Sequence, residues 1–498
     1  MTTGKNNILN NRCPPGSSGA PSGGTEDVVF TSCSRCFPID TQAIRSKILD
    51  LAMRGKLTEQ LAGDGTAEEL YRQIQAKKQG LIKTGILREE KPLPEITGEE
   101  VPFSIPPSWR WVYLGELFQH NTGKALNSSD RQGQQLEYIT TSNLYWNRFE
   151  LDGLKTMSFT DSECEKCTVR KGDLLVCEGG DIGRSAIWNY DYEMRIQNHI
   201  HRLRRYSENI CTEFYYYLLW LYKQTGRING IGIGLQGFSS KRVHSLIVPL
   251  APYDEAVRLV EVIKQAFSIL DSIDALQTQY ADNLTVLKSK LIDAAIQGKM
   301  TEQLPEDGTA EELYQQIQAE KQALIQAGKL KKRKPQPEIT DNDIPFAIPS
   351  NWKWVPLGEL ISIESGRGLT AAQMKPGRIP VYGGNGISGH HDCAFVPEGT
   401  VVIGRVGYYC GSVHVTEQEA WVTDNAFITT YPEKCIDKWF LVHALRHMKL
   451  GQENNGAAQP VVSGKKIYPL AFPLPPLAEQ KRIAAKLEEL LQLCERPK

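Results

Sequence analysis

The cysteines offer the first spacing that could do chemistry, because two Cys-x-x-Cys pairs together could supply the four thiolates of a zinc site. One pair, Cys33 with Cys36, lies in a Gly/Ser/Pro-rich stretch, and the other, Cys164 with Cys167, lies in DSECEKC. Nothing repeats these pairs in the second half of the chain. The 11 cysteines are scattered over 498 residues with no secretory signal, which is typical of reduced thiols. Incidental thiols are therefore the favoured interpretation.

A glycine-rich run from Tyr382 to His391, YGGNGISGHH, could bring backbone amides close to a phosphate. A tight turn between strands is the favoured alternative, because glycine commonly serves in such turns. His390 and His391 are metal-ligand types, but adjacent side chains on a strand point to different faces. Since no clear third ligand accompanies them, the sequence does not predict a metal site here.

Basic residues cluster in HIHRLRR (199–205) and in KLKKRK (329–334). Each cluster could contact phosphates or form a solvated face, and the pattern does not decide between them. The aromatic runs FYYYLLWLY (214–222) and KWFLVHALRHM (438–448) could stack on bases. Large aromatic side chains usually fill cores, however, so these runs predict buried amphipathic helices.

Enzyme signatures are missing from the sequence. It contains no G-x-x-x-x-G-K-[ST] phosphate loop, no H-E-x-x-H, no G-x-S-x-G, and no G-x-G-x-x-G that follows a strand and opens a helix. It also lacks the Asn-Pro-Pro-aromatic or Asp-Pro-Pro-aromatic tetrapeptide of amino-methyltransferases. We therefore expect the chain to catalyse nothing by itself.

The overall composition limits the elements that could position such residues. The length predicts two to four domains, and 41% hydrophobic residues can fill ordinary cores. With a formal net charge of -1, any nucleic-acid surface must be local. No apolar run approaches the roughly 18 to 20 residues of a membrane-spanning helix, and the first residues lack the apolar core of a signal peptide. These features predict a cytoplasmic protein with no membrane partner.

An internal duplication organises the chain, because residues 46–117 and 289–360 align without a gap. In each copy a helix ends near RGKLTEQL or QGKMTEQL, and an Asp-Gly pair then makes a turn. Thr66 with Glu69, and Thr309 with Glu312, have the spacing of a reciprocal cap at the start of a second helix. Gly85 and Gly328 mark its predicted ends.

A long helix is predicted upstream of the second copy, where apolar residues recur in steps of three and four from about 253 to 304. Its start, VPLAPYDEAVRLVEVI (248–263), resembles FPLPPLAEQKRIAAKL (472–487), and its end is echoed at 44–61. The chain therefore looks circularly permuted, with both termini midway along a second, antiparallel helix. Between the repeated blocks lie two strand-rich regions, 118–242 and 361–466, which do not match each other well.

The two-fold order of these blocks resembles the specificity subunit of Type I restriction-modification systems, HsdS, from Ile44 to the C-terminus. The pattern F-x-I-P-x-x-W-x-W-V-x-L-G-E-L enters each strand-rich region, and SSKRVHSLIVPLAP or SGKKIYPLAFPLPPLAEQ leaves it. Inside the regions, LLVCEGGDIGRSAIW and VVIGRVGYYCGSV look like parts of two target-recognition domains. One departure is the first exit, which reads APYDEAVRL where the second reads PPLAEQKRI.

This resemblance implies an α+β fold with two globular target-recognition domains joined by two long antiparallel helices in a pseudo-two-fold repeat. Each domain would read one half of a bipartite site in double-stranded DNA, and the helices would set the spacer. Two modification (methyltransferase) subunits would dock on the duplicated scaffold, and restriction (translocase/nuclease) subunits would join the complex. No cofactor is expected in this chain, since S-adenosylmethionine, ATP and Mg would belong to the partners.

The predicted division of the chain follows the same pattern. It runs from a disordered tail (1–40) and a first conserved helical region (41–100) to the first target-recognition domain (101–252), a central helical region (253–343), the second target-recognition domain (344–476) and a distal helix (477–498). Polar or basic residues beside glycine-rich turns are the predicted DNA contacts: Arg184, Gln197, His199, Gln236, Lys241, Arg367, Asn385, Arg405, Asn425, Gln459 and Lys465.

Two alternatives remain open at this stage. A self-contained DNA methyltransferase or nuclease is disfavoured by the missing motifs. Incubation of the pure chain with DNA and S-adenosylmethionine distinguishes such an enzyme from a recognition subunit without catalytic activity. A two-armed coiled-coil adaptor that binds protein or glycan is disfavoured by the repeat order. A salt-dependent DNA-binding assay separates that alternative from DNA recognition.

Overall fold

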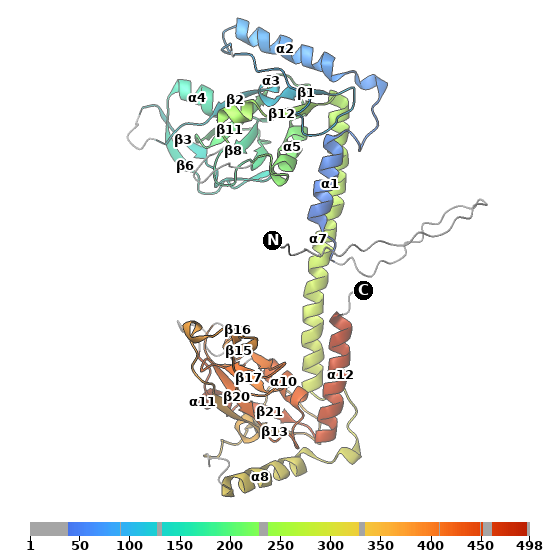
Figure 1. Ribbon diagram of the computed structural model, residues 1–498, viewed down its shortest axis with the longest axis vertical. Helices are drawn as coiled ribbons and strands as arrows, with labels where there is room; N and C mark the ends of the chain where they lie inside the picture. Colours follow the sequence, from blue (N-terminus) through green and yellow to red (C-terminus); the bar gives the residue numbers. More distant parts are fainter. Residues whose placement is uncertain are drawn as a thin grey trace, which may run out of the picture.

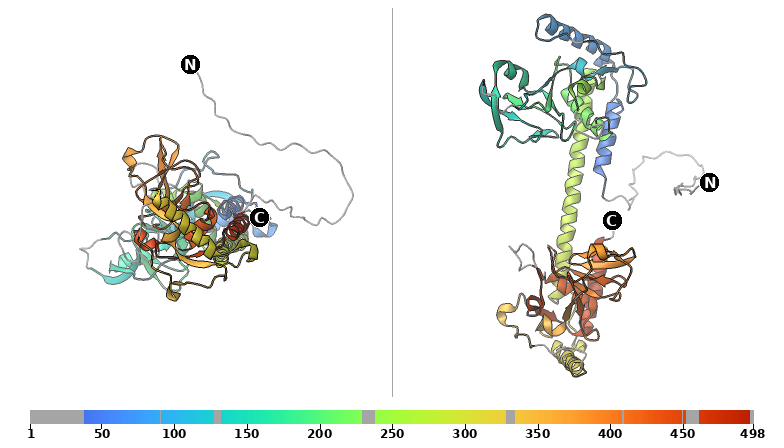
Figure 2. Two further views of the ribbon diagram at one scale, coloured as in Figure 1. Left: turned by 90° about the horizontal axis from the view of Figure 1, so that it is seen from below. Right: turned by 60° about the vertical axis from the view of Figure 1, so that its left-hand side comes forward.

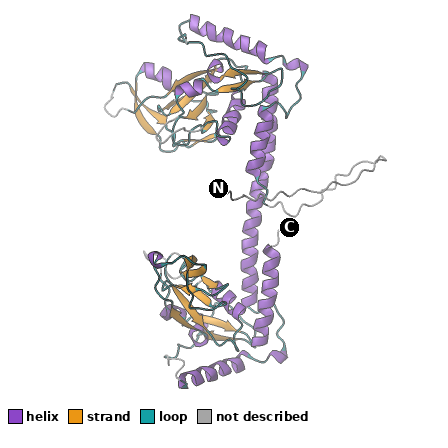
Figure 3. Cartoon of the chain, viewed as in Figure 1, coloured by secondary structure: helices purple, strands orange, loops and turns teal. Residues whose placement is uncertain are grey.

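The computed structural model describes residues 38–89, 91–126, 132–228, 238–327, 334–407, 409–448, 450–451 and 461–495. Two globular arms project from the same side of a helical rod, one at each end (Figure 1). We call residues 101–252 the first arm and residues 344–476 the second arm. The strands lie in the arms, and the rod is built of helices (Figure 3). This mixed architecture confirms the predicted fold class.

The rod consists of one long helix, α7 (Tyr253–Ile296), and two shorter helices that pack on its two ends. Helix α1 (Thr41–Met53) lies beside its first half, and α12 (Leu477–Glu495) lies beside its second half (Figure 1; Figure 2, right). The first described residues and the last ones therefore both lie near the middle of α7. This arrangement confirms the predicted split of the second helix between the two ends of the chain.

Polar contacts fix the two short helices on α7 at separate places. Arg45 of α1 is buried, and its Nη2 donates to Asp271 at 2.8 Å and to Asp274 at 2.9 Å. Just before α1, the Ile39 amide donates to Oε1 of Gln277 at 2.5 Å. Near the other end, Lys288 pairs with Glu495 of α12 at 3.1 Å. Each short helix is thus held by its own half of α7.

Helix α7 ends at Ile296, earlier than the predicted end near Leu304, because a glycine follows the capping residue Gln297. Gly298 has φ +68°, and a Cβ atom there would come within 2.5 Å of the Pro349 ring. Gly55, after α1, has φ +64° and would meet Pro106 at 2.5 Å. The left-handed backbone and this close approach both require glycine. The G-K in each repeat is therefore where the chain leaves the rod.

We call the places where the arms join the rod the two corners. At the first corner the carboxylate of Glu255, fully buried in α7, accepts from Trp109 Nε1 at 2.9 Å and from Gln60 Nε2 at 2.8 Å. At the second corner Glu479, fully buried in α12, accepts from Trp352 Nε1 at 2.8 Å and from Gln303 Nε2 at 2.9 Å. The duplicated sequence thus builds the same buried network twice.

An arginine one turn further along each helix adds a bidentate ion pair to its corner. Arg258 donates to both oxygens of Asp64 at 2.7 Å, and Arg482 donates to those of Asp307 at 2.7 and 2.6 Å. The side chains of Asp64 and Asp307 are only 6% and 3% exposed. The hydrogen bond from the arginine lowers the pKa of each aspartate below its ordinary value.

Acid should therefore loosen both corners. An aspartate whose folded pKa is depressed stabilises the fold above its unfolded pKa of about 3.9, and this contribution is lost as the pH falls through the folded value. We expect Asp64→Asn to lower the unfolding midpoint at pH 7, at a cost of about 1 to 3 kcal/mol, and to make it less sensitive to pH between 5 and 3. Thermal unfolding midpoints of the parent and of Asp64→Asn, measured at several pH values, test this prediction. A variant that is as acid-sensitive as the parent contradicts it.

Two further helices lie across the outer ends of the molecule, α2 (Ala67–Lys83) and α8 (Ala310–Gln326) (Figure 1). They follow short 3-10 turns at Ala62–Asp64 and Pro305–Asp307. Thr309 and Glu312 form the predicted reciprocal cap, whereas at α2 the structure gives only the bond from the Glu69 amide to Thr66. Gly85 ends α2 with φ +74° as predicted, and Gly328 lies outside the described residues.

Each arm enters and leaves through a two-stranded antiparallel ribbon. In the first arm β1 (Arg110–Tyr113) pairs with β12 (Ile247–Leu250), and in the second β13 (Lys353–Pro356) pairs with β21 (Ala471–Leu474). Short helices flank the ribbons: α3 (Leu114–Leu117), α6 (Ser240–His244), α9 (Leu357–Leu360) and α11 (Gly464–Ile467). The beginning and the end of each arm are therefore tied together beside the rod.

The first arm contains two four-stranded sheets. One has the order β2 (Phe118–Thr122), β11 (Ile200–Arg205), β8 (Leu174–Cys177) and β9 (Ser185–Ile187), and the other has the order β6 (Lys155–Phe159), β3 (Gln134–Ile139), β10 (Met194–Ile196) and β7 (Thr168–Val169). A small hairpin, β4 (Leu144–Tyr145) and β5 (Arg148–Phe149), and the helices α4 (Asp161–Cys167) and α5 (Thr212–Gln224) complete the arm.

The second arm repeats the order of the first sheet, and its second sheet has three strands in place of four. Its first sheet is β14 (Ser362–Ser365), β20 (Ala426–Thr430), β17 (Val401–Gly404) and β18 (Val413–Val415), and its second is β16 (Gly386–His391), β15 (Ile379–Gly383) and β19 (Trp421–Val422). In both arms the second sheet contains one parallel pair, β3 with β10 and β15 with β19. The two regions that look unrelated in sequence are thus two versions of one fold.

The aromatic runs form core helices, which confirms their prediction as buried. Helix α5 buries Phe214, Tyr215 and Tyr216 together with residues of α1 and α7, and α10 (Lys438–His447) buries Phe440 in the second arm. In the described parts of the chain, every helix is too short or too polar to cross a membrane.

Candidate nucleic-acid interface

Matched glycines show which positions in the two arms correspond. A Cβ atom at Gly123, after β2, would come within 2.0 Å of the Ile196 carbonyl, and one at Gly366, after β14, would come within 2.2 Å of the Val422 carbonyl. Each glycine therefore lies against the end of β10 or β19, the strand that pairs in parallel with its neighbour in the second sheet. The loops after β10 and β19 consequently occupy equivalent places in the two arms.

In the first arm the predicted contacts differ in how much of each side chain remains accessible. Arg184 is 18% exposed, donates from Nη2 to the Thr141 carbonyl at 2.6 Å, and lies over the Tyr145 ring. Gln197 is half-buried after β10, whereas His199 and Lys241 are exposed. Gln236 lies outside the described residues. Arg184 therefore has a structural role already, and all five residues stay predictions as DNA contacts.

In the second arm four of the six predicted contacts are exposed, three of them on loops. Arg367 lies over the Phe395 ring at 4.3 Å, and Asn385 lies in the turn between β15 and β16. Arg405 follows β17 directly and is half-buried. The remaining predicted residues of this arm divide into Asn425 and Lys465, which are exposed, and Gln459, which lies outside the described residues. These assignments also stay predictions.

A cavity of about 710 Å³ brings several of these loops of the second arm together. It is lined by Gly368 after β14, by Gly383 and Gly384 before the hairpin turn, and by Asn425 before β20. Gly383 and Gly386 pair across this turn, which confirms a tight turn between strands as the role of the glycine-rich run. The structure thus places Asn425 at a concave surface formed by strand ends.

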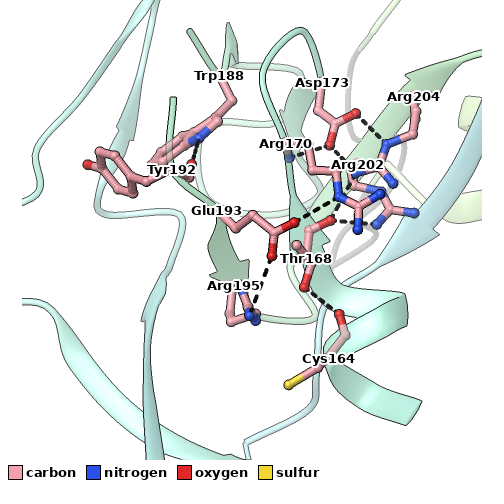
Figure 4. Close-up of polar contacts among 10 residues, drawn as sticks. All are labelled: Cys164, Thr168, Arg170, Asp173, Trp188, Tyr192, Glu193, Arg195, Arg202 and Arg204. Atoms are coloured by element: carbon pink, nitrogen blue, oxygen red, sulfur yellow. Dashed lines mark hydrogen bonds and ion pairs between the residues drawn. The ribbon is translucent and has the colours of Figure 1, made fainter. Parts of the chain in front are cut away.

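The central part of the basic cluster HIHRLRR fits neither of its two predicted roles, whereas His199 at its start is exposed and stays a predicted DNA contact. His201 and Arg202 are buried in β11, and Arg202 Nη1 donates to the Thr168 carbonyl at 2.6 Å (Figure 4). Arg204 makes a bidentate pair with the buried Asp173 at 2.8 and 2.6 Å. Burial lowers the pKa of Arg202 to about 10. These side chains hold the two sheets of the first arm together, so a phosphate contact and a solvated face are both wrong for them.

His391 has two neighbours of ligand type, since its ring nitrogen lies within 4.8 Å of Asp392 and Cys393 ligand atoms. Its Nδ1 accepts from the Lys375 amide at 3.1 Å, so the proton of the neutral ring is on Nε2, which faces Asp392 at 3.2 Å. A metal at Nε2 would displace that proton and leave Nδ1 facing a donor. The arrangement therefore favours an ordinary hydrogen-bonded histidine. Cys33 and Cys36 lie outside the described residues.

One acidic residue was missed by the choice of polar and basic candidates. Glu178 follows β8 as Arg405 follows β17. The Glu178 amide donates to the carbonyl of His199, just before β11, at 2.9 Å. The Arg405 amide donates in the same way to the carbonyl of Asn425, just before β20, also at 2.9 Å. The correspondence becomes visible only from the backbone pairing, because the loops EGGDIGR and RVGYYCG share little sequence beyond glycines.

The chain matches the family model described as Type I restriction modification DNA specificity domain at residues 106–285 and again at 349–496. It is 24% identical to the Type I restriction enzyme EcoAI specificity subunit of Escherichia coli, over 91% of this chain and 90% of that protein. It is also 27% identical to the Type I restriction enzyme EcoEI specificity subunit of the same organism, over 64% of this chain and 61% of that protein.

A solved structure of a type I R-M system chain has a similar fold, with a TM-score of 0.50 and 17% identity, covering 79% of this chain and 93% of that one. The two family matches cover both arms and the helix that follows each of them, so the duplication seen in the sequence is also a duplication of the family's domain. The chain belongs to the Type I restriction modification DNA specificity domain family.

Proposed function

We propose that this chain is the DNA-recognition subunit of a Type I restriction-modification complex and has no catalytic activity of its own. Each arm reads one half of a bipartite site in double-stranded DNA, and α7 sets the distance between the halves. One observation carries the proposal: two arms of the same topology but different loop sequences are attached to one rod through identical corners.

The constant and variable parts of the molecule have different tasks in this proposal. Base readout requires side chains that differ with the sequence read, whereas partner binding requires a surface that stays the same. The loops after β8 and β17 differ, while the corner residues are repeated. The repeated scaffold therefore suits two copies of one partner, a modification subunit that supplies S-adenosylmethionine chemistry on adenine.

The middle of α7 offers a docking surface for these partners. The apolar stripe is buried at both ends, for example at Phe267 and Ala295, but it is exposed in between, where Leu276 and Leu287 are 64% and 45% exposed. An exposed apolar stripe with helical spacing is typical of a surface that receives another helix. Restriction subunits, which would use ATP and Mg, complete the proposed assembly.

A reconstitution experiment tests the proposal. The purified chain, incubated with S-adenosylmethionine and genomic DNA, should transfer no methyl group, and addition of the modification subunit should produce methylated adenines in one bipartite motif. Methyl transfer by the chain alone would favour the self-contained enzyme. DNA binding by the complex that is weak and independent of salt would favour the adaptor, because phosphate contacts make binding salt-dependent.

A further inference from the structure

We infer that each arm discriminates bases with a pair of side chains at the joined ends of two strands: Glu178 with His199 in the first arm, and Arg405 with Asn425 in the second. This inference deepens the proposed function and rests on it. It adds an acidic residue to the reading surface and assigns opposite charges to one backbone position in the two arms.

The backbone establishes the equivalence of the two pairs. The amide of Glu178 donates to the His199 carbonyl at 2.9 Å, and its own carbonyl accepts from the Phe238 amide at 2.8 Å. Arg405 does the same in the second arm, donating to the Asn425 carbonyl at 2.9 Å and accepting from the Val462 amide at 2.9 Å. Phe238 and Val462 lie just before α6 and α11.

A second set of contacts extends this match along the loop. The Gly183 amide donates to the Cys177 carbonyl at 3.0 Å, and the Gly411 amide donates to the Gly404 carbonyl at 2.7 Å. Cys177 and Gly404 immediately precede Glu178 and Arg405. The loops after β8 and β17 therefore start and close in the same way, so that the first residue of each loop has the same backbone surroundings.

The side chains at this shared position keep polar atoms available, although the Arg405 guanidinium also lies over the Phe427 ring at 5.5 Å. The Glu178 carboxylate is 26% exposed and lies 3.5 Å from Nδ1 of His199, which is 57% exposed. Among the described residues, the hydrogen bonds of the Arg405 guanidinium both start from Nη1, to Ser365 Oγ at 3.2 Å and to the Asp424 carbonyl at 3.3 Å. Nε and Nη2 of Arg405 remain as donors.

The charge of Glu178 favours a contact with a DNA base over a contact with the sugar-phosphate backbone of the DNA. A carboxylate beside the phosphates of DNA is repelled, whereas at a base edge it can accept from the amino group of cytosine. Arginine and asparagine form bidentate bonds with guanine and adenine, respectively. A residue kept only for the fold would be expected to resemble Asp173, which is buried and held by both nitrogens of Arg204.

The test uses the complete complex with its modification subunits and maps methylated adenines in a library of random sequences. Glu178→Gln keeps the size of the side chain but replaces one acceptor with a donor. We expect preference at one position of one half-site to fall by about tenfold to a hundredfold. Arg405→Ala should do the same in the other half-site only. Glu193→Gln is the control, because that exposed carboxylate pairs with Arg170 at 2.9 Å and should leave every position unchanged.

The outcomes separate this inference from the proposed function. If the parent complex methylates no bipartite motif, the proposed function fails. If the parent complex does methylate such a motif, three results for Glu178→Gln overturn the inference. The variant could keep every base preference, it could reduce the methylation of all sequences alike, or it could alter the same half-site as Arg405→Ala. If Glu178→Gln abolishes methylation, competition binding with single-substituted duplexes decides: lost preference at one position supports the inference, and retained preference overturns it.

Discussion

Replacing Glu255 by alanine is expected to lower the free energy of unfolding by about 2 to 4 kcal/mol, through the loss of one buried acceptor. The carboxylate is fully buried and accepts from Trp109 and Gln60, which lie on the entry to the first arm and on the segment between α1 and α2. Its removal leaves the indole N-H of Trp109 without this acceptor and leaves a cavity, whereas Gln60 Nε2 keeps its bonds to the carbonyls of Gly55 at 3.0 Å and Thr58 at 3.3 Å. The first corner should therefore open before the rest of the molecule.

The duplicated corner provides a matched comparison. Glu479→Ala should cost a similar amount, since Glu479 accepts from Trp352 and Gln303 in the same way. Glu261→Ala is the control on α7, because that side chain is 57% exposed and pairs only loosely with Lys264 at 3.4 Å. Calorimetric melts of the three variants measure the effect. Midpoints for Glu255→Ala that equal those of Glu261→Ala would show that the corner networks do not stabilise the fold.

The scaffold could be predicted from the sequence because its signals are local or repeated. The stripe that includes Phe267 and Ala295 has helical spacing, and the cap at Thr309 uses neighbours three residues apart. The duplication then extends each local prediction to the other half. Even the split of the second helix follows, since FPLPPLAEQKRIAAKL at the end of the chain matches the start of α7.

The arms could be predicted only as strand-rich, because their fold depends on contacts between distant residues. Strand β11 pairs with β2, far earlier in the chain, and nothing in HIHRLRR shows that Arg202 lies between two sheets. The burial of Glu255 is equally hidden, since its partner Trp109 is 146 residues away and YDEAV looks like an exposed helix start. The equivalence of Glu178 and Arg405 follows from backbone bonds that the sequence does not reveal.

Lengthening α7 by seven residues is expected to move the two arms apart without changing what either arm reads. The insertion belongs after Asp282, between Gln277, which is hydrogen-bonded to the segment before α1, and Lys288, which meets α12. Seven residues add about 10.5 Å and nearly two full turns. The second arm therefore returns to almost the same side of the rod, with the apolar stripe in register.

The expected change in the DNA site follows from the rise of the double helix. About 10.5 Å corresponds to roughly three base pairs at 3.4 Å each, so the spacer should grow while both half-sites remain. Two inserted residues serve as the control, because they rotate the second arm by about 200° around α7 and should abolish methylation. A rod that only holds the arms together, without setting their distance, would tolerate both insertions equally.

If α7 holds two independent reading arms at a fixed separation, a change in its length must appear in the methylated DNA site. Methylated adenines are mapped in DNA from cells that carry the system with either the parent chain or the seven-residue insertion. We expect one bipartite motif in each case, with identical half-sites and a longer spacer for the lengthened chain. Unchanged spacing with activity retained, or altered half-sites, would contradict this expectation.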